Sequence, residues 1–331
     1  MATSVFLKTK NQAYVKMMSA LLIKNMAKTE MNKRIYPGHN ACAGCGQLVA
    51  VQAVMRALGN EKIIIANATG CLEVTSTAYP QTAWGLPWLH SLFENPSSLA
   101  SGIKAALKKQ KKDDVKVIVQ AGDGGTFDIG LGLISGAWER GDNFIYICYD
   151  TEAYSNTGVQ ASGSTPLGAS TTTSPNSDCP EVKTTCPLVP GSTQAKKDML
   201  AIALAHGLKY VAQTSAGYPD DITRKIKKAL TIDGPSYIQI FSPCVLGWKT
   251  KYDEAVNLGK LAVQTGLYPL LEYENGQLIA VSKLPANNPK VEEYLKLQGR
   301  YSHLLADNRY QSTISSIQKT ADNNISKYGL R

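Results

Sequence analysis

Short apolar runs alternate with segments of helical periodicity through the middle of the chain. The apolar runs predict buried strands and lie at 62–66, 115–120, 143–149, 209–213 and 236–241. The segments with helical spacing lie before the first run at 47–58, and between the runs at 97–108, 129–139, 197–206 and 220–230. Strands that alternate with helices pair in parallel through right-handed crossovers. The pattern therefore predicts an α/β fold with a doubly wound, mainly parallel sheet.

The pattern changes on both sides of this region and divides the chain into three parts. Residues 1–34 form a basic N-terminal extension, residues 35–250 the α/β domain, and residues 251–331 a C-terminal appendage with helices and a hairpin around Asn275. We expect the appendage to pack on the core or on partner subunits. Within the α/β domain, residues 155–196 are rich in Ser, Thr, Pro and Gly, and a loop of this length is often functional.

The net charge of +9 is concentrated in the N-terminal extension. Residues 1–34 carry seven basic side chains against one glutamate, which leaves +6 of the total there. Such a charge run is typical of a solvated or subunit-docking segment. The basic residues are not interleaved with aromatic ones and no nucleic-acid-binding motif is present, so we expect no nucleic-acid partner. No apolar run is long enough to cross a membrane, so we expect no membrane partner and a cytoplasmic location.

A glycine-rich turn follows the predicted strand at 115–120. It reads Gly122-Asp123-Gly124-Gly125, at the carboxyl end of a parallel strand, where open α/β sheets bind phosphates. Glycines let the backbone approach a diphosphate, and the following helix begins beside it. A carboxylate next to a diphosphate needs a cation between them, and Mg²⁺ prefers such oxygen ligands. The neighbouring strand ends near Thr151, 28 residues after Asp123, where we expect further oxygen ligands.

Four of the seven cysteines stand where they could meet at one edge of the sheet. Cys42 and Cys45 form a C-x-x-C pair in a loop, Cys71 follows one predicted strand, and Cys244 follows another. Four thiolates suit either a zinc ion or an iron–sulfur cluster, and spacing does not separate the two. Of the other three cysteines, Cys148 lies in a predicted strand and is expected to be buried. Cys179 and Cys186 lie in the long loop.

These motifs together resemble those of the β subunits of 2-oxoacid:ferredoxin oxidoreductases. The likeness covers most of residues 35–250. It rests on His-x-x-Cys-x-Gly-Cys-Gly at 39–46, Ala-Thr-Gly-Cys at 68–71, Gly-Asp-Gly at 122–124 and Asp-Thr-Glu-Ala-Tyr-Ser-Asn-Thr-Gly at 150–158. The resemblance implies a sheet of the thiamine-diphosphate-binding type. It also implies that Asp123, the Thr151 hydroxyl and the Ala153 carbonyl hold Mg²⁺.

The resemblance assigns the remaining site residues as well. It implies a [4Fe–4S] cluster on Cys42, Cys45, Cys71 and Cys244, and it makes Asn156 the candidate catalytic residue facing the substrate and the thiazolium ring. The residues that it implies for thiamine diphosphate are Thr69, Gly70, Cys71, Phe93, Gly122, Asp123, Gly124, Gly125 and Asn156. One position departs from some single-chain relatives, because Gln47 stands where they have an acidic residue.

The implied reaction is the reversible oxidative decarboxylation of a 2-oxoacid to acyl-coenzyme A and CO₂, with electrons passing through the cluster to ferredoxin. The resemblance of residues 165–175 to pyruvate-type members favours pyruvate. The alternatives are 2-oxoisovalerate, 2-oxoglutarate or oxalate as substrate, and a non-enzymatic zinc-binding scaffold. We assign no residue here to the glutamate that activates the cofactor, which relatives take from the α subunit. We therefore expect activity only together with α, γ and δ subunits.

Overall fold

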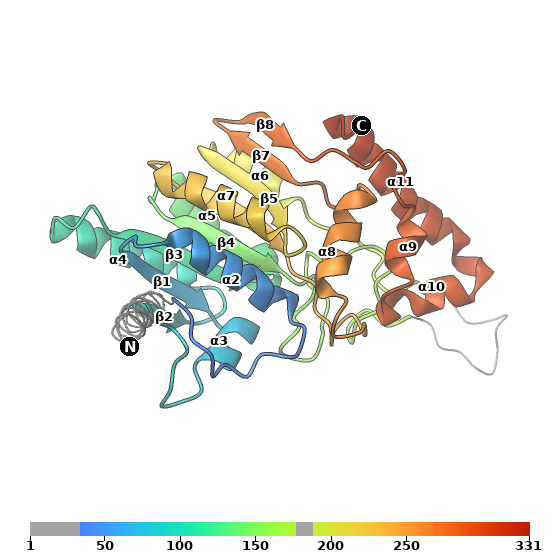
Figure 1. Cartoon of the computed structure of the whole chain (residues 1–331), viewed down its shortest axis with the longest axis horizontal. Helices are drawn as coiled ribbons and strands as arrows, with labels where there is room; N and C mark the ends of the chain where they lie inside the picture. The colour runs from blue at the N-terminus through green and yellow to red at the C-terminus, as the bar shows by residue number, and fades with distance from the viewer. Residues whose placement is uncertain (1–33, 177–187) are drawn as a thin grey trace, which may run out of the picture.

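In residues 34–176 and 188–331, which the computed structural model describes, eight strands form one sheet in the order β2-β1-β3-β4-β6-β5-β7-β8 (Figure 1). In chain order they are β1 (Ile63–Ala68), β2 (Trp88–Ser91), β3 (Lys116–Gly122), β4 (Ile145–Asp150), β5 (Tyr210–Ser215), β6 (Ser236–Phe241), β7 (Leu271–Glu274) and β8 (Gln277–Val281). The first six strands pair in parallel, and β7 and β8 are antiparallel to their neighbours. The predicted α/β fold with a mainly parallel sheet is confirmed.

Helices cover both faces of the sheet, as a doubly wound fold requires (Figure 1). On one face lie α2 (Gly46–Leu58) and α7 (Pro219–Thr231), and on the other lie α4 (Pro96–Lys109), α5 (Leu131–Glu139) and α6 (Met199–Ala205). Successive strand residues point to opposite faces. In β1, Ile63 and Ile65 join the first core cluster while Ile64 and Ala66 join the second. All five helices predicted within the α/β domain are confirmed.

Two regular elements were missed by the sequence patterns. Strand β2 has only four residues and lies at the edge of the sheet, where the half-exposed sequence WLHS shows neither a buried run nor clean alternation. Helix α3 (Cys71–Ser76) is a single short helix between β1 and β2. A π-helical turn, η1 (Gly124–Asp128), precedes α5 and was predicted as part of a loop. Helix α3 and the η1 turn both contribute residues to the cavity described below.

The segment after residue 250 both extends the sheet and adds a helical cluster. The predicted hairpin around Asn275 is confirmed as β7 and β8, and β7 pairs with β5 of the main sheet. The helices are α8 (Ala255–Gln264), α9 (Val291–Leu295), α10 (Ser302–Ala306) and α11 (Gln311–Tyr328), with short turns η2 (Gly299–Tyr301) and η3 (Asn308–Tyr310). They surround a third apolar cluster that includes Phe241 at the end of β6 and Trp248. The sheet therefore crosses the boundary that the sequence places at residue 250.

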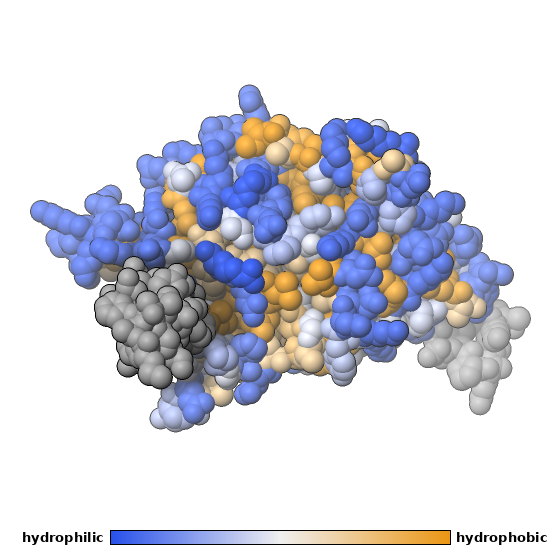
Figure 2. Space-filling model, viewed as in Figure 1, coloured by the Kyte–Doolittle hydropathy of each residue, from blue (hydrophilic) through white to orange (hydrophobic). Residues whose placement is uncertain are grey.

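The outer surface carries mostly polar side chains on the face shown in Figure 2, with apolar residues exposed between them. In the part of the chain that the structure describes, no helix has both the length and the apolar character needed to span a bilayer. The basic extension up to residue 33 lies outside the described residues, and so do Cys179 and Cys186.

Candidate functional site

A cavity lies at the carboxyl ends of β1, β3 and β4. These strands are neighbours in the sheet, so their ends bring distant parts of the chain together. The structure places all the residues that the sequence assigned to thiamine diphosphate and Mg²⁺ in its wall: Thr69, Gly70, Cys71, Phe93, Gly122, Asp123, Gly124, Gly125, Thr151, Ala153 and Asn156. The cavity also opens at the carboxyl edge of the sheet, where doubly wound folds bind ligands.

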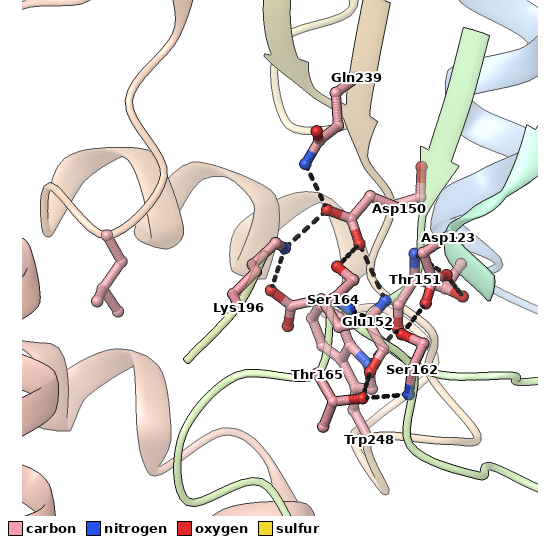
Figure 3. Close-up of polar contacts among 12 residues, drawn as sticks. Asp123, Asp150, Thr151, Glu152, Ser162, Ser164, Thr165, Lys196, Gln239 and Trp248 are labelled. Atoms are coloured by element: carbon pink, nitrogen blue, oxygen red, sulfur yellow. Dashed lines mark hydrogen bonds and ion pairs between the residues drawn. The ribbon is translucent and has the colours of Figure 1, made fainter. Parts of the chain in front are cut away.

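Asp123 is buried just beyond the end of β3, and three donors fix its carboxylate (Figure 3). Its Oδ1 accepts hydrogen bonds from the Thr151 backbone N–H at 3.0 Å and from Thr151 Oγ1 at 2.9 Å. Its Oδ2 accepts a hydrogen bond from Ser162 Oγ at 2.5 Å. The structure therefore joins the turn after β3 to the end of β4, as the sequence predicts.

The Thr151 hydroxyl lies at the spacing of a neighbouring Mg²⁺ ligand from each of the other two oxygen atoms predicted to hold the ion. Thr151 Oγ1 lies 2.9 Å from Asp123 Oδ1 and 3.1 Å from the Ala153 carbonyl oxygen. In an octahedron with metal–oxygen distances of about 2.1 Å, adjacent ligands are separated by about 3 Å. A carboxylate, a hydroxyl and a carbonyl are also the hard oxygen donors that Mg²⁺ prefers. The residues present therefore fit this cation.

The surroundings of Asp123 favour a cation for a second reason. Burial, and next the nearby Asp150 carboxylate, raise the pKa of Asp123 to about 7. A divalent cation in contact with the carboxylate would favour its charged form and oppose both effects. Asp150 itself accepts hydrogen bonds from Ser164 Oγ at 2.5 Å and from Gln239 Nε2 at 2.8 Å.

Two glycines of the turn after β3 have different surroundings. A Cβ atom at Gly122 would meet nothing within 4 Å, so this backbone faces open space in the cavity wall. A Cβ atom at Gly124 would lie 2.2 Å from the Tyr154 ring. The sequence predicts that both glycines allow close approach of a diphosphate. The structure gives Gly124 a separate reason, because its backbone accommodates the Tyr154 ring.

The C-x-x-C loop packs directly against the chain that follows β6. The Gly46 backbone N–H donates to the Pro243 carbonyl at 3.2 Å, next to Cys244. A Cβ atom at Gly44, whose φ is +72°, would overlap the Tyr252 carbonyl oxygen. The glycines in Cys-x-Gly-Cys-Gly therefore let Cys45 approach the segment that carries Cys244.

The four cysteines of the predicted cluster are electrostatic neighbours. Burial, and then the thiols of Cys244 and Cys45, raise the pKa of Cys71 to about 12, with a smaller contribution from Cys42. Burial is also the largest effect raising the pKa of Cys45, with contributions from Cys244 and Cys42. The structure thus gathers the two ends of the loop, the start of α3 and the segment after β6 at one place.

Among the residues with described positions, no set of three or more His, Cys, Asp or Glu side chains forms a ready-made site for one metal ion. The structure, like the spacing of the cysteines in the sequence, leaves both zinc and an iron–sulfur cluster open. Cys148 is fully buried in β4, which confirms its prediction as a core residue.

Several residues that contact the site were missed by sequence reasoning. Ser162 and Ser164 bond to the two aspartates from the long loop, whose length was the one available signal. Trp248 Nε1 donates to the Thr151 carbonyl at 3.0 Å, and Arg300 lies beyond it. No spacing in the sequence relates these last two residues to the site. Gln47, the departure noted above, lies in the cavity wall.

Comparison with known proteins places this geometry in a family. Residues 68–240 match the family described as "Thiamine pyrophosphate enzyme, C-terminal TPP binding domain". The chain is 47% identical to the pyruvate synthase subunit PorB of Methanosarcina barkeri, over 92% of this chain and 100% of that protein. This chain belongs to the PorB family of pyruvate synthase subunits. As a member of that family, it is a subunit of a multisubunit, thiamine-diphosphate-dependent oxidoreductase.

Similar proteins include another PorB subunit, a subunit named for a different 2-oxoacid, and one solved structure. The PorB subunit of Methanocaldococcus jannaschii is 46% identical over 89% of this chain and 96% of that protein. The ketoisovalerate oxidoreductase subunit VorB of Pyrococcus furiosus is 39% identical over 90% of this chain and 93% of that protein. A solved 2-oxoglutarate:ferredoxin oxidoreductase from Magnetococcus marinus superposes with a TM-score of 0.53 at 26% identity, covering 64% of this chain and 67% of that one.

Proposed function

We propose that this chain binds thiamine diphosphate, Mg²⁺ and a [4Fe–4S] cluster in a complex that oxidatively decarboxylates pyruvate to acetyl-coenzyme A and CO₂ and reduces ferredoxin. The observation that carries the proposal is one cavity wall that contains both Asp123, bonded to Thr151, and Cys71. When bound, thiamine diphosphate supplies a nucleophilic carbon and an electron sink, and a cluster accepts electrons one at a time. The shared wall keeps these two groups within one subunit.

The chain's own residues have distinct tasks in this proposal. Asp123, Thr151 and Ala153 hold Mg²⁺ against the diphosphate, and the open backbone at Gly122 lets the phosphate groups approach. Asn156 lies in the same wall and contacts Cys71, whose pKa its side chain lowers slightly against the larger effect of burial. This position suits an amide that orients the substrate next to the cluster.

Cys42, Cys45, Cys71 and Cys244 are the proposed cluster ligands. Their support is the contact between the C-x-x-C loop and the segment after β6, together with the effect of neighbouring thiols on the pKa values of Cys45 and Cys71. The zinc alternative has less support, because the cysteine motifs at 39–46 and 68–71 resemble those of β subunits in which these cysteines hold a cluster.

Partner subunits complete the site in this proposal. Cofactor activation needs a glutamate against the aminopyrimidine ring, and we assign no residue of this chain to that role. Gln47 lies in the cavity wall as an uncharged amide. The α subunit would supply that glutamate, and the γ and δ subunits would carry electrons onward to ferredoxin. Leu92 precedes the cavity residue Phe93 and Ile129 follows the η1 turn, and their 61% and 57% exposure is what an apolar contact with a partner would require. We place the complex in the cytoplasm, where free cysteines remain reduced.

Pyruvate is the proposed 2-oxoacid because the PorB relatives named for pyruvate synthase are 42–48% identical to this chain. 2-Oxoisovalerate is the second candidate, since the VorB relative is 39% identical over 90% of the chain. Coenzyme A and the 2-oxoacid would reach the cavity from the side where partner subunits assemble.

The test is anaerobic co-expression with the partner subunits, followed by measurement of viologen reduction with a panel of 2-oxoacids and coenzyme A. The proposal expects pyruvate to give the highest kcat/KM, with activity absent from the isolated chain. Turnover by the isolated chain would contradict a site completed by partner subunits. A higher kcat/KM with 2-oxoisovalerate would make that 2-oxoacid the substrate in place of pyruvate.

A further inference from the structure

Two acidic residues stand on either side of Thr151 and are buried with it. The side chains of Asp150 and Glu152 are 0% and 5% exposed. Buried carboxylates remain charged only when positive groups and hydrogen-bond donors compensate them. Glu152 also has φ of +58°, in the left-handed region that side chains other than glycine rarely adopt. The backbone around Thr151 is therefore held in an uncommon conformation by its surroundings.

Lys196, at the end of the long loop, binds both of these carboxylates (Figure 3). Lys196 Nζ lies 2.7 Å from Asp150 Oδ2 and 2.9 Å from Glu152 Oε1. Lys196 thus ties together the residues before and after Thr151.

A second cation comes from the C-terminal helices. Arg300 Nη2 lies 2.7 Å from Glu152 Oε2, 148 residues away in the sequence, and its side chain is only 3% exposed. The central carbon of its guanidinium lies 3.8 Å from the centroid of the Trp248 ring, in a cation–π contact. Trp248 in turn donates to the Thr151 carbonyl oxygen at 3.0 Å (Figure 3).

Arg300 therefore reaches Thr151 by two routes. One passes through the Glu152 carboxylate, and the other passes through the Trp248 ring to the Thr151 carbonyl. Both routes hold the backbone at Thr151 and Glu152 in place. The Thr151 hydroxyl donates to Asp123 Oδ1. Arg300 and Trp248 lie beyond residues 68–240, which match the thiamine-binding family.

We propose that Arg300, with Lys196, is a positioning residue that sets the Thr151 hydroxyl and the neighbouring carbonyl in place for the Mg²⁺ ion of the cofactor. The inference rests on the proposed function, because it assigns Thr151 to Mg²⁺. The helical segment after residue 250 is then a part of the cofactor site, although none of its residues lines the cavity. Residues that orient metal ligands from outside typically change metal affinity by about 10–100-fold when they are removed.

A matched control exists elsewhere in the fold. Lys225 is 1% exposed and donates to Asp221 Oδ2 and to the Gln213 carbonyl, each at 2.8 Å. None of these three residues lines the cofactor cavity. Lys225→Met therefore breaks a buried ion pair, as Arg300→Met does, without touching the loop that carries Thr151.

The experiment measures the Mg²⁺ concentration that gives half-maximal thiamine diphosphate binding to the anaerobically assembled complex, with a thermal unfolding midpoint for each variant. We expect Arg300→Met to raise this concentration by about tenfold or more. Arg300→Lys keeps the charge but loses the planar contact with Trp248, so it should recover part of the loss. Lys225→Met should lower the unfolding midpoint and leave the Mg²⁺ concentration unchanged.

Equal Mg²⁺ requirements in wild type and Arg300→Met would overturn the inference, and so would equal increases in Arg300→Met and Lys225→Met. If Arg300→Met does not assemble, Arg300→Lys decides the question, since an unchanged Mg²⁺ requirement in that variant contradicts a positioning role. A wild-type complex that binds no thiamine diphosphate would overturn the proposed function as well. The wild-type titration therefore separates the two claims.

Discussion

Asp123 and Thr151 are 28 residues apart, and Thr151 donates both its backbone N–H and its hydroxyl to the same oxygen of the Asp123 carboxylate. The two bonds, at 3.0 and 2.9 Å, connect the ends of neighbouring parallel strands β3 and β4. The Thr151 hydroxyl also lies 3.1 Å from the Ala153 carbonyl oxygen. This small group of oxygens is the structural basis for the proposed Mg²⁺–diphosphate site.

Asp123→Asn should abolish Mg²⁺-dependent binding of thiamine diphosphate. The amide keeps the shape of the side chain but removes the negative charge that the cation and diphosphate arrangement requires. Isothermal titration of the assembled complex checks this prediction. Asp114→Asn is the control, because Asp114 pairs with Lys62 on the surface at 2.6 Å and takes no part in the cavity. Wild-type affinity in Asp123→Asn would contradict the assignment.

Ser162→Ala should weaken Mg²⁺ binding by about 10–100-fold, as removal of the partner that orients a metal ligand generally does. The Ser162 hydroxyl donates to Asp123 Oδ2 at 2.5 Å and leaves Oδ1 to Thr151. Without it, the carboxylate can rotate away from the other oxygens. The measurement is the Mg²⁺ dependence of thiamine diphosphate binding, and Ser162→Thr should restore most of the affinity.

Gly122→Ala should weaken cofactor binding, whereas Gly124→Ala should lower the free energy of unfolding. A methyl group at Gly122 meets no protein atom within 4 Å, so the free energy of unfolding should stay unchanged while cofactor binding weakens. A methyl group at Gly124 would lie 2.2 Å from the Tyr154 ring, and such overpacking generally destabilises by about 1–3 kcal/mol. Chemical denaturation and cofactor titration of both variants check the pair. A destabilised Gly122→Ala that binds the cofactor normally would contradict this interpretation.

Replacing Cys42, Cys45, Cys71 or Cys244 with alanine should lower the iron and sulfide content of the anaerobic complex by about four of each, the content of one [4Fe–4S] cluster. Each cysteine contributes one of the four gathered thiols, and loss of a ligand exposes or destabilises a cluster. Cys148→Ala is the matched control, because Cys148 is fully buried within β4. Iron and sulfide analysis with EPR gives the answer. Stoichiometric zinc without iron in the wild type would support the alternative site.

Local patterns in the sequence were sufficient to predict the central architecture. The apolar runs at 115–120 and 143–149 became β3 and β4, since buried parallel strands read as continuous apolar segments. The motif at 122–125 could be placed at a cofactor site because strand ends share one edge of the sheet. Strand β2 escaped prediction because an edge strand of four half-exposed residues has no such pattern.

The second layer of the site could not be predicted, for a physical reason. The contact between Glu152 and Arg300 spans 148 residues and depends on how the C-terminal helices pack against Phe241 and Trp248. Periodicity describes the faces of an element but not which distant side chain compensates a buried charge. Likewise, the four cysteines could be grouped by their strand ends, but spacing alone left zinc and iron–sulfur open.

The most direct test of the central claim is EPR of the anaerobically purified complex before and after addition of pyruvate and coenzyme A, with thiamine diphosphate and iron quantified in the same sample. The account predicts about four irons for the cluster of this chain in addition to those of its partners, stoichiometric thiamine diphosphate, and a pyruvate-dependent reduced-cluster signal that Cys71→Ala removes. A complex that contains zinc in place of iron at these cysteines, or that lacks thiamine diphosphate, would contradict it.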